Sequence, residues 1–373
     1  MSEPIRVLHI LQRMEAGGSQ TLLMNLYRNI NRDKIQFDFL VEYKEKYFYD
    51  DEVTQLGGKI YYTSVRQDFN ILKFTRQLRK ILQEGHYTII HVHAYTIGYF
   101  VLKVAKECGV KVRIVHSHSN SMIRDWRSFP KWILQKLYPI YATDFFASSE
   151  DAGNYIFKHN NFIVLKNGID TTRFQPNLTM RKKVRSEMNL ENDFVIGHVG
   201  RFNAAKNHNF LLDVFANVVK IDPNAKLLLV GSGELEKKIK EKVYSLKLEN
   251  NILFLGNRKN MEDIYQAMDV FVLPSIFEGL GIVGIEAQAC GVPTLCSEKV
   301  PDEANVSPLF YKMSLSEDPI RWAKKIIEIS KDKYAHKNVK KYIKNSGFDI
   351  KESTEFLENF YINKAKENRE ERQ

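Results

Sequence analysis

The stretch Pro274–Pro293, PSIFEGLGIVGIEAQACGVP, decides the fold of the second half of this chain. The run Asp269–Leu273, rich in Val and Phe, comes directly before it. This order predicts a strand, then a glycine-containing loop, then a helix that begins near Gly281. Glu278 lies in the loop and Glu286 in the first turns of the helix. Because the N–H groups of a helix N-terminus attract phosphate, we expect an anion site at this strand end.

The two carboxylates of this stretch suit a ligand that lies along it. At 1.5 Å per helical residue, Glu278 and Glu286 would be roughly 10–12 Å apart. Glycines 279, 281 and 284 let a ligand approach the backbone. The ordinary interpretation makes Glu278 an exposed loop acid and Glu286 an acid on a helix face. The position directly after a strand favours the functional interpretation.

A second motif, GRFNAAKNH at 200–208, follows the predicted strand FVIGHV. Arg201 and Lys206 flank a loop that opens into a helix near Asn207. Arginine binds phosphate oxygens in a bidentate manner and lysine acts as a point charge, so the pair suits a diphosphate. The alternative, two solvated surface bases, is less favoured because the loop lies between a strand and a helix.

Strands alternate with helical stretches through most of the chain, which predicts an α/β fold with parallel sheets. The helical stretches include Phe69–Gln83, with four apolar residues on one face. The predicted strands are Ile5–Leu11, Phe37–Val41, Lys59–Tyr62, Thr88–Val92, Lys111–Val115, Asp144–Ala147, Phe162–Leu165, Phe194–Val199, Lys226–Val230, Asn251–Leu255, Asp269–Leu273 and Thr294–Cys296. Ligands of such sheets bind beyond the carboxyl ends of the strands, so function is expected in the following loops.

The turn-rich stretch Asn167–Asn177 divides these strands into two sets. We therefore expect two Rossmann-like domains, 1–172 and 173–348, whose parallel sheets face each other across a cleft. Residues 349–373 are expected to form a helix that crosses back to the first domain. Its last ten residues, Lys364–Gln373, are almost wholly charged and are expected to fray.

Composition excludes several classes of protein. The 373 residues are 44% hydrophobic and 27% charged, which is ordinary for a folded globular protein. The net charge of +10 is spread along the chain and no nucleic-acid motif is present, so no nucleic-acid partner is expected. No apolar run reaches the roughly 18 residues of a membrane span, and the N-terminus reads as a first strand rather than a signal peptide. The three cysteines lack metal-ligand spacing and suit a reducing, cytoplasmic compartment.

The two long motifs, GRFNAAKNH and FEGLGIVGIEAQACGVP, resemble those of glycosyltransferase family 4, retaining enzymes of the GT-B fold. The resemblance extends in order through Gly17-Gly18, HVH at 91–93, HSHS at 116–119, SSEDAG at 148–153 and NGID at 167–170. It covers nearly the whole chain and is closest to the branch that serves bacterial exopolysaccharide and capsule assembly. The paired C-terminal motifs are specific, whereas the N-terminal ones alone would be weak.

The resemblance implies a role for each matching residue. Arg201 and Lys206 would bind the donor diphosphate, Glu286 the ribose and Glu278 the donor sugar. His116 would lie near the reacting sugar, with His118 as the alternative. The implied donor-binding set consists of Gly17, Gly18, Arg201, Lys206, Gly256, Asn257, Arg258, Glu278, Gly279, Leu280, Gly281, Ile282, Val283 and Glu286. The first domain would hold the acceptor and the second the donor.

The implied reaction transfers a hexose from a nucleotide-diphosphate sugar to a glycan or a lipid-linked acceptor. A UDP-sugar is the favoured donor, although the sequence itself names neither the base nor the sugar. Many transferases hold a divalent metal with a D-x-D triplet, and this sequence contains none. Arg201, Lys206 and the helix N-terminus would replace it as fixed electrostatic stabilisers. We therefore expect no cofactor and no catalytic metal.

Some signals point elsewhere. His91 and His93 lie on one face of a strand and could bind metal, but a polar strand end is favoured without a third ligand. Glu42, after the second strand, lies where a dehydrogenase binds ribose, so an oxidoreductase is a minor rival.

The aromatic and basic stretch Arg124–Tyr141 suits either the inner face of an anionic plasma membrane or packing on the sheet. A nucleotide-sugar epimerase of the same fold and an inactive homologue that only binds nucleotide-sugar also stay open.

Overall fold

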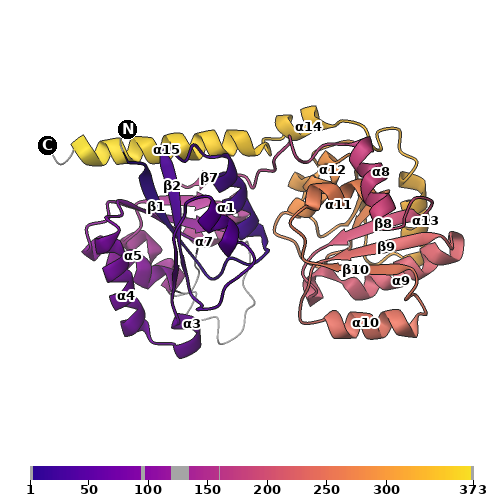
Figure 1. The fold of residues 1–373 in the computed structure, drawn as a ribbon, viewed down its shortest axis with the longest axis horizontal. Coiled ribbons are helices and arrows are strands. Elements are labelled where there is room, and N and C mark those ends of the chain that lie inside the picture. Colours follow the sequence, from indigo (N-terminus) through magenta and orange to yellow (C-terminus); the bar gives the residue numbers. More distant parts are fainter. Residues whose placement is uncertain (1–2, 94–96, 119–133, 159, 371–373) are drawn as a thin grey trace. The chain divides into compact units, whose positions relative to one another are not determined.

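The computed structural model describes residues 3–93, 97–118, 134–158 and 160–370. The chain divides into two compact units, one formed by Met1–Gly168 with Ile350–Gln373 and the other by Ile169–Asp349. Each unit contains one fully parallel sheet with helices on both of its faces (Figure 1). The predicted α/β class with two Rossmann-like sheets is thereby confirmed.

The sheet of the N-terminal unit has the strand order β3-β2-β1-β4-β5-β6-β7. Its strands are β1 (Ile5–Leu11), β2 (Ile35–Val41), β3 (Ile60–Tyr62), β4 (Ile89–Val92), β5 (Val112–Ser117), β6 (Asp144–Ala147) and β7 (Ile163–Val164). The order reverses direction between β1 and β4, where His9 lies opposite His91. Doubly wound sheets bind their ligands at such a switch point.

The helices of this unit cover both faces of its sheet. They are α1 (Gly18–Asn29), α2 (Asp50–Gln55), α3 (Val65–Asp68), α4 (Ile71–Glu84), α5 (Gly98–Glu107), η1 (Tyr138–Ile140), α7 (Glu150–Phe157) and α15 (Ile350–Glu370). Leu8 and Ile90 pack with α4 and α5 on one face, and Val7 and Phe37 pack with α1 and α15 on the other. Alternating side chains along each strand thus supply two separate cores.

The C-terminal unit has the strand order β10-β9-β8-β11-β12-β13. Its strands are β8 (Phe194–Val199), β9 (Ala225–Val230), β10 (Ile252–Gly256), β11 (Val270–Leu273), β12 (Thr294–Ser297) and β13 (Phe310–Met313). Its helices are α8 (Leu178–Glu187), η2 (Ala204–Lys206), α9 (His208–Ile221), α10 (Glu236–Ser245), α11 (Met261–Ala267), α12 (Ile282–Ala289), η3 (Asp302–Ala304), α13 (Pro319–Ile329) and α14 (Lys340–Asn345). The switch point of this sheet lies between β8 and β11.

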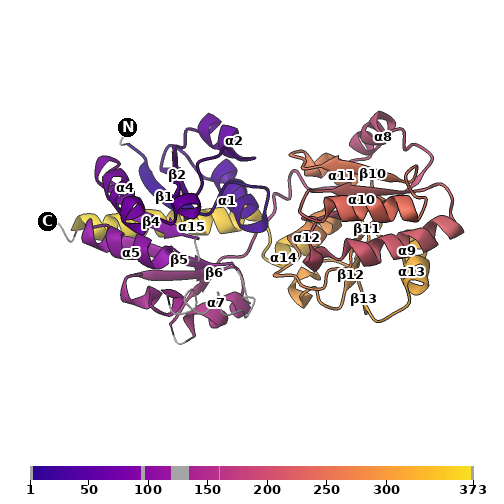
Figure 2. The ribbon, with the colours of Figure 1, turned by 90° about the horizontal axis from the view of Figure 1, so that it is seen from below.

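Two apolar clusters hold this second sheet. One face packs against α8, α11, α12 and α14, and the other packs against α9, α10 and α13. Figure 1 shows α9 and α10 below the sheet, and Figure 2, seen from below, looks onto them. The central strands of the unit are therefore covered by helices on both faces, which is typical of parallel sheets.

The C-terminal end of the chain differs from expectation. α14 ends at Asn345 and α15 begins at Ile350. The prediction that the tail frays from Lys364 is wrong, because α15 is helical as far as Glu370. Lys364 Nζ lies 2.9 Å from Asp144 Oδ1, and Ala365 is buried, so this part of the helix is held against the N-terminal unit.

Candidate functional site

The candidate site of the C-terminal unit lies at the carboxyl ends of β8 and β11, the two strands that flank the switch point. The loop after β8 carries Arg201 and Lys206, and the loop after β11 carries Glu278. The Ile276 N–H donates to the carbonyl oxygen of Ala205 at 2.8 Å, so the two loops are joined by their backbones. Two motifs separated by some 70 residues in the sequence thus form one surface.

Lys206 and Glu278 form an ion pair across the two loops. Their side chains are 18% and 9% exposed, so solvent screens the pair only weakly. The Ser275 hydroxyl donates to the same Glu278 oxygen at 2.7 Å. Asn203 accepts from the Lys206 N–H at 3.3 Å and fixes the short turn that presents the lysine. The ammonium group and the carboxylate therefore stand side by side at the strand ends.

Arg201 has different surroundings. Its Nε lies 3.5 Å from Glu234 Oε2, which belongs to the loop after β9, and both side chains are more than half exposed. Exposed ion pairs of this kind contribute about 0–1 kcal/mol, so an anionic ligand could displace Glu234 at little cost. The structure thus presents Arg201 as an available cation and Lys206 as a fixed one.

The N-terminus of α12 borders these loops. Gly281 is its N-cap and has φ +78, in the left-handed region that favours glycine. A Cβ at this position would lie 3.1 Å from Val300 Cγ1. Since a glycine N-cap offers no side-chain acceptor, the first N–H groups of the helix, including those of Ile282 and Val283, are left for a ligand or solvent. Gly279, in the preceding loop, borders open space.

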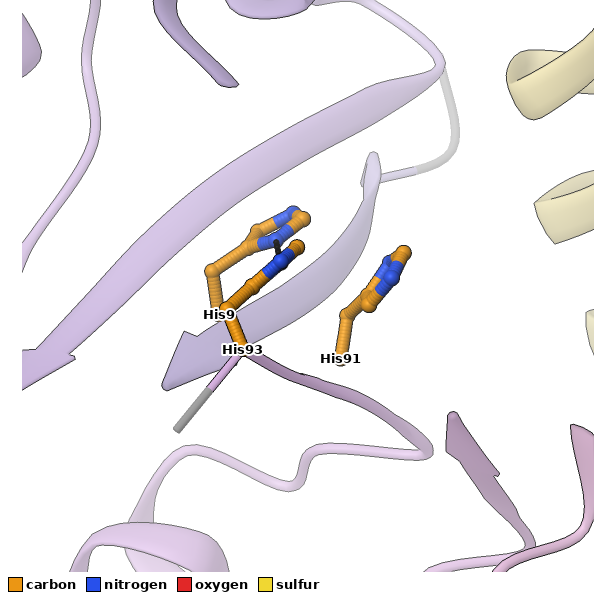
Figure 3. Close-up of side chains that lie close together, drawn as sticks. All are labelled: His9, His91 and His93. Carbon is orange, nitrogen blue, oxygen red and sulfur yellow. Dashed lines mark hydrogen bonds between the residues drawn. The ribbon is translucent and has the colours of Figure 1, made fainter. Parts of the chain in front are cut away.

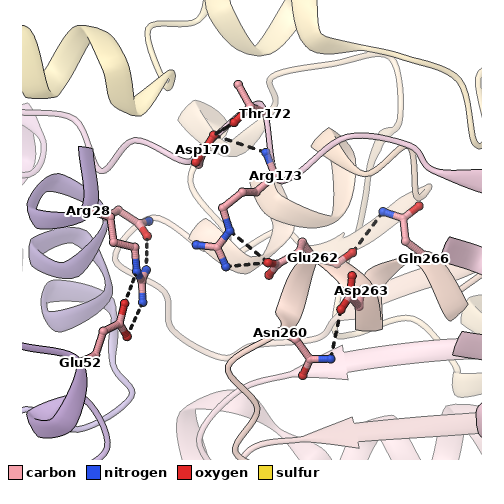
Figure 4. A network of polar contacts seen from close by, with 10 residues as sticks. Arg28, Glu52, Asp170, Thr172, Arg173, Asn260, Glu262, Asp263 and Gln266 are labelled. Carbon is pink, nitrogen blue, oxygen red and sulfur yellow. Dashed lines mark hydrogen bonds and ion pairs between the residues drawn. The ribbon is translucent and has the colours of Figure 1, made fainter. Parts of the chain in front are cut away.

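Glu286 lies deeper, on the body of α12, and is only 5% exposed. The Tyr265 hydroxyl on α11 donates to its Oε2 at 2.9 Å. Burial raises the pKa of Glu286 to about 7, the hydrogen bond from Tyr265 opposes that rise, and the charge of Glu262 adds to it. Figure 4 shows Glu262 held by Arg173, whose Nε and Nη2 donate to Oε1 at 3.0 and 2.7 Å. Near neutral pH the Glu286 carboxyl therefore exists in both protonation states.

A glycine loop after β9, absent from the predictions, completes this edge of the sheet. Gly231 has φ +130, and a Cβ there would overlap the carbonyl oxygen of Gly200. The Phe202 N–H donates to the carbonyl oxygen of Ser232 at 2.9 Å, and Asn257 Nδ2 donates to the Ser232 hydroxyl at 3.1 Å. The loops after β8, β9 and β10 are thereby tied together. The pattern Gly-Ser-Gly directly after an apolar strand was the available signal.

β10 ends at Gly256, and Asn257 and Arg258 follow it at the same edge. Gly256 has φ +63 and its carbonyl oxygen accepts from the Gly231 N–H at 2.9 Å. Arg258 is exposed. β10 is an outer strand of the sheet, and β9 lies between it and β8, the strand that precedes Arg201. Contact of these residues with a base stays a prediction.

The N-terminal unit carries the remaining predicted residues. Gly17 is the N-cap of α1, which begins at Gly18, directly after the loop that follows β1. A Cβ at Gly18 would meet no atom within 4 Å. Asn167 Nδ2 donates to the carbonyl oxygen of Gly18 at 3.4 Å. The glycine pair thus lies at the switch point of the first sheet.

His116 and His118 extend from β5, which runs further than predicted and ends at Ser117. His116 is the deeper residue, at 2% exposure, and its ring centroid is 4.1 Å from that of His118. His118 is partly buried, and its Nε2 lies 2.8 Å from Nδ1 of His93. Burial lowers the pKa of His118 to about 4, and burial together with neighbouring histidines lowers that of His116 well below its usual range. Both rings are neutral at pH 7.

Two rival signals have structural explanations. Glu42, which kept an oxidoreductase open, is fully buried and ion-paired with Arg66. The aromatic stretch Arg124–Tyr141 lies outside the described residues as far as residue 133. In its remaining part, Tyr138 is buried against Gly98 and Ile140 is exposed. Among the residues that the structure describes, no helix is long and apolar enough to cross a membrane.

Comparisons with known proteins show which family the chain matches. Residues 16–173 match the family model described as Glycosyltransferase Family 4, and residues 180–346 match that described as Glycosyl transferases group 1. EpsF of Bacillus subtilis, which is named as a glycosyltransferase, is 33% identical over 372 residues, covering 95% of this chain and 96% of its own. CapH of Staphylococcus aureus, named as a capsular polysaccharide biosynthesis glycosyltransferase, is 24% identical and covers 97% and 99%.

A third relative is named for its reaction. An Escherichia coli UDP-Gal:alpha-D-GlcNAc-diphosphoundecaprenol alpha-1,3-galactosyltransferase is 23% identical, covering 96% of this chain and 97% of its own. Among solved structures, Anabaena HepE in complex with UDP and glucose superposes with a TM-score of 0.79 at 18% identity. It covers 96% of this chain and 99% of HepE. At 18% sequence identity, the similarity to HepE is evidence of a shared fold and of nothing further.

Proposed function

Since this chain belongs to the group 1 glycosyltransferases of family 4, we propose that it transfers a hexose from a UDP-sugar with retention and without a catalytic metal. The acceptor is a growing glycan or a lipid-linked sugar of a capsule or exopolysaccharide. The observation that carries the proposal is the joining of the Lys206 and Glu278 loops at the switch point beside the α12 N-terminus.

The geometry supports a donor site in the C-terminal unit. The diphosphate would lie between Lys206, Arg201 and the first N–H groups of α12, where fixed positive charge and backbone donors converge. Glu278, held by Ser275 and Lys206, would accept hydrogen bonds from the sugar hydroxyls. Glu286, oriented by Tyr265, would bind the ribose hydroxyls, and Gly256, Asn257 and Arg258 would lie against the base.

The reaction needs positive charge near the leaving group, and Lys206 and Arg201 supply it. Breaking the glycosidic bond leaves a nucleoside diphosphate whose negative charge grows in the transition state. Preorganised cations at that place stabilise the transition state more than the ground state. Lys206 is preorganised by its pair with Glu278, so it needs little rearrangement when the donor binds.

Retention and acceptor proton transfer are proposed from the family. The acceptor hydroxyl would attack on the face from which the phosphate leaves, and the departing phosphate oxygen would take its proton. His116, a neutral imidazole at pH 7, would contact the reacting sugar rather than act as a charged acid. The relatives named for capsule synthesis and for a diphosphoundecaprenol acceptor support a lipid-linked acceptor at a membrane surface.

A thermal-shift panel with UDP, GDP, ADP and NAD, each with and without EDTA, tests the donor site. We expect UDP alone to raise the melting temperature, EDTA to leave the shift intact, and Glu286→Ala to abolish it. A shift with NAD only, or with no diphosphate nucleotide, would contradict the proposal. A UDP shift that EDTA removes would contradict its metal independence.

Turnover measurements test the role of the cations. Lys206→Met should lower kcat about 10²–10³-fold, as removal of other preorganised charge-stabilising groups does. Lys299→Met is a suitable control, because Lys299 lies after β12 and pairs with its neighbour Glu298. Equal turnover in the Lys206 variant and the wild type would remove Lys206 from the mechanism. The anomeric configuration of the product, read by NMR, tests retention.

A further inference from the structure

Five histidines gather at the carboxyl ends of three neighbouring strands of the N-terminal sheet. They are His9 on β1, His91 and His93 at the end of β4, and His116 and His118 at the end of β5. The register places His9 opposite His91, and Val92 opposite Val115. Because alternate residues of a strand share a face, all five rings lie on the same side of the sheet. They form a continuous stack with ring centroids 4.1–5.4 Å apart.

We propose that His9, His91 and His93 bind a divalent transition-metal ion, with Zn²⁺ as the type ion. Figure 3 shows the three rings side by side. One ring nitrogen from each lies within 4.8 Å of those of the other two, and all three side chains are buried. Nδ1 of His9 lies 3.1 Å from Nε2 of His93. Two nitrogens on a tetrahedral zinc at about 2.0–2.1 Å are about 3.3 Å apart, so the separation of this pair is close to that of two zinc-bound nitrogens.

The burial of these rings is costly without such a ligand. Among the described residues, Nε2 of His9 and Nε2 of His91 have no hydrogen-bond partner. An unsatisfied buried polar atom costs about 1–3 kcal/mol. Apolar side chains would fill the same space without that cost, as Phe37 and Phe39 do on the next strand. A metal ion bound to Nε2 of His91 would satisfy a nitrogen that the described residues leave unpaired.

His91 is oriented in the manner of a metal ligand. Its Nδ1 lies 2.7 Å from the hydroxyl of Tyr361 on α15. When that hydroxyl accepts from Nδ1–H, the lone pair of the ring is on Nε2, the nitrogen without a partner. Metal-binding histidines commonly use their second nitrogen in this way. Tyr361 is therefore a positioning residue for the site.

The chemistry of the donor atoms decides which ion the site would take. Imidazole nitrogen favours zinc, copper and nickel, whereas Mg²⁺ prefers oxygen. The site is thus different in kind from the diphosphate-bound cation of D-x-D enzymes.

Metal analysis of the full chain, purified with a tag that lacks histidine, tests this proposal. The protein is loaded with Zn²⁺, freed of excess ion by gel filtration and analysed by inductively coupled plasma mass spectrometry. We expect about one tightly held Zn²⁺ per chain. His9→Phe keeps a ring against Phe37 and should abolish retention, as should His91→Gln. His198→Phe, at an equally buried histidine of the other unit, should retain the ion.

A second variant separates ligation from packing. Tyr361→Phe keeps the ring in the core and should weaken zinc affinity about 10–100-fold, as loss of a hydrogen bond to a metal-bound histidine does. Retention far below one ion in the wild type would overturn the proposal, as would unchanged retention in folded His9 and His91 variants. If those variants misfold, the visible spectrum of the Co²⁺-loaded wild type decides whether the ion is bound by the proposed site. Intense tetrahedral bands support the site and weak octahedral bands contradict it. Zinc is measured without UDP, so failure here leaves the donor proposal untouched.

Discussion

At the scale of single residues, Glu286 links burial to pH dependence. Burial raises its folded-state pKa from 4.5 to about 7. The unfolded chain therefore loses this proton first as pH rises. The stabilising contribution of the protonated group is complete below about pH 4.5 and is lost as pH rises through about 7.

Glu286→Gln removes this titration while keeping the hydrogen-bonding shape of the side chain. We expect the free energy of unfolding of the variant, relative to wild type, to rise by up to about 3 kcal/mol between pH 4.5 and pH 7.5. Urea denaturation at several pH values measures the difference. Glu249→Gln, at an exposed position, is the control and should show a flat difference. A flat difference for Glu286→Gln as well would mean that the carboxyl titrates as it does in the unfolded chain.

The sequence identifies the charged residues of the candidate site better than their partners. Arg201, Lys206, Glu278 and Glu286 stand in loops or helix starts after strands, which a local pattern reveals. Of their partners, Ser275 lies in the same loop as Glu278. Tyr265 and Glu234, in contrast, come from other elements and meet them only through the fold. His9 is a similar case, because β1 pairs with β4 across more than 80 intervening residues and no local spacing relates it to His91.

At the scale of secondary structure, the sequence predicts every strand of the two sheets except one edge strand, β13. Strands such as β8 and β9 are covered on both faces and read as continuous apolar runs. β13 (Phe310–Met313) was missed because it pairs with β12 alone, is only partly buried and carries the exposed Lys312. Its sequence therefore lacks the apolar run that reveals a central strand.

The loop after β9 yields a prediction at this scale. Gly231→Ala should destabilise the C-terminal unit by about 1–3 kcal/mol or more, because its backbone adopts φ +130 and a Cβ would overlap the Gly200 carbonyl. Thermal denaturation measures the loss. Gly279→Ala is the matched control, since its φ lies outside the left-handed region and a Cβ there meets nothing within 4 Å. Equal melting temperatures for the two variants would show that the loop relaxes freely.

At the scale of the whole molecule, the chain order and the folding units do not coincide. α15 follows the C-terminal unit in sequence but belongs to the N-terminal one, where it contacts α1 and β1. Leu357 and Tyr361 on its inner face are fully buried in the core that also contains Val7 and Phe37. The last helix therefore completes the apolar core on one face of the first sheet, and this core cannot form in full until α15 has been made.

Leu357→Ala tests this dependence. The substitution opens a cavity in the N-terminal core and should cost about 2–5 kcal/mol. Hydrogen exchange should then accelerate in β1, β2 and α1, which share that core, while β8 and β11 keep their protection because they lie in a separate one. Glu355→Ala, two residues away on the exposed face, should leave both units unchanged. Exchange that accelerates only within α15 would mean that the helix is an appendage rather than part of the core. In that case Tyr361 could not hold His91 in place, so the same experiment also bears on the proposed metal site.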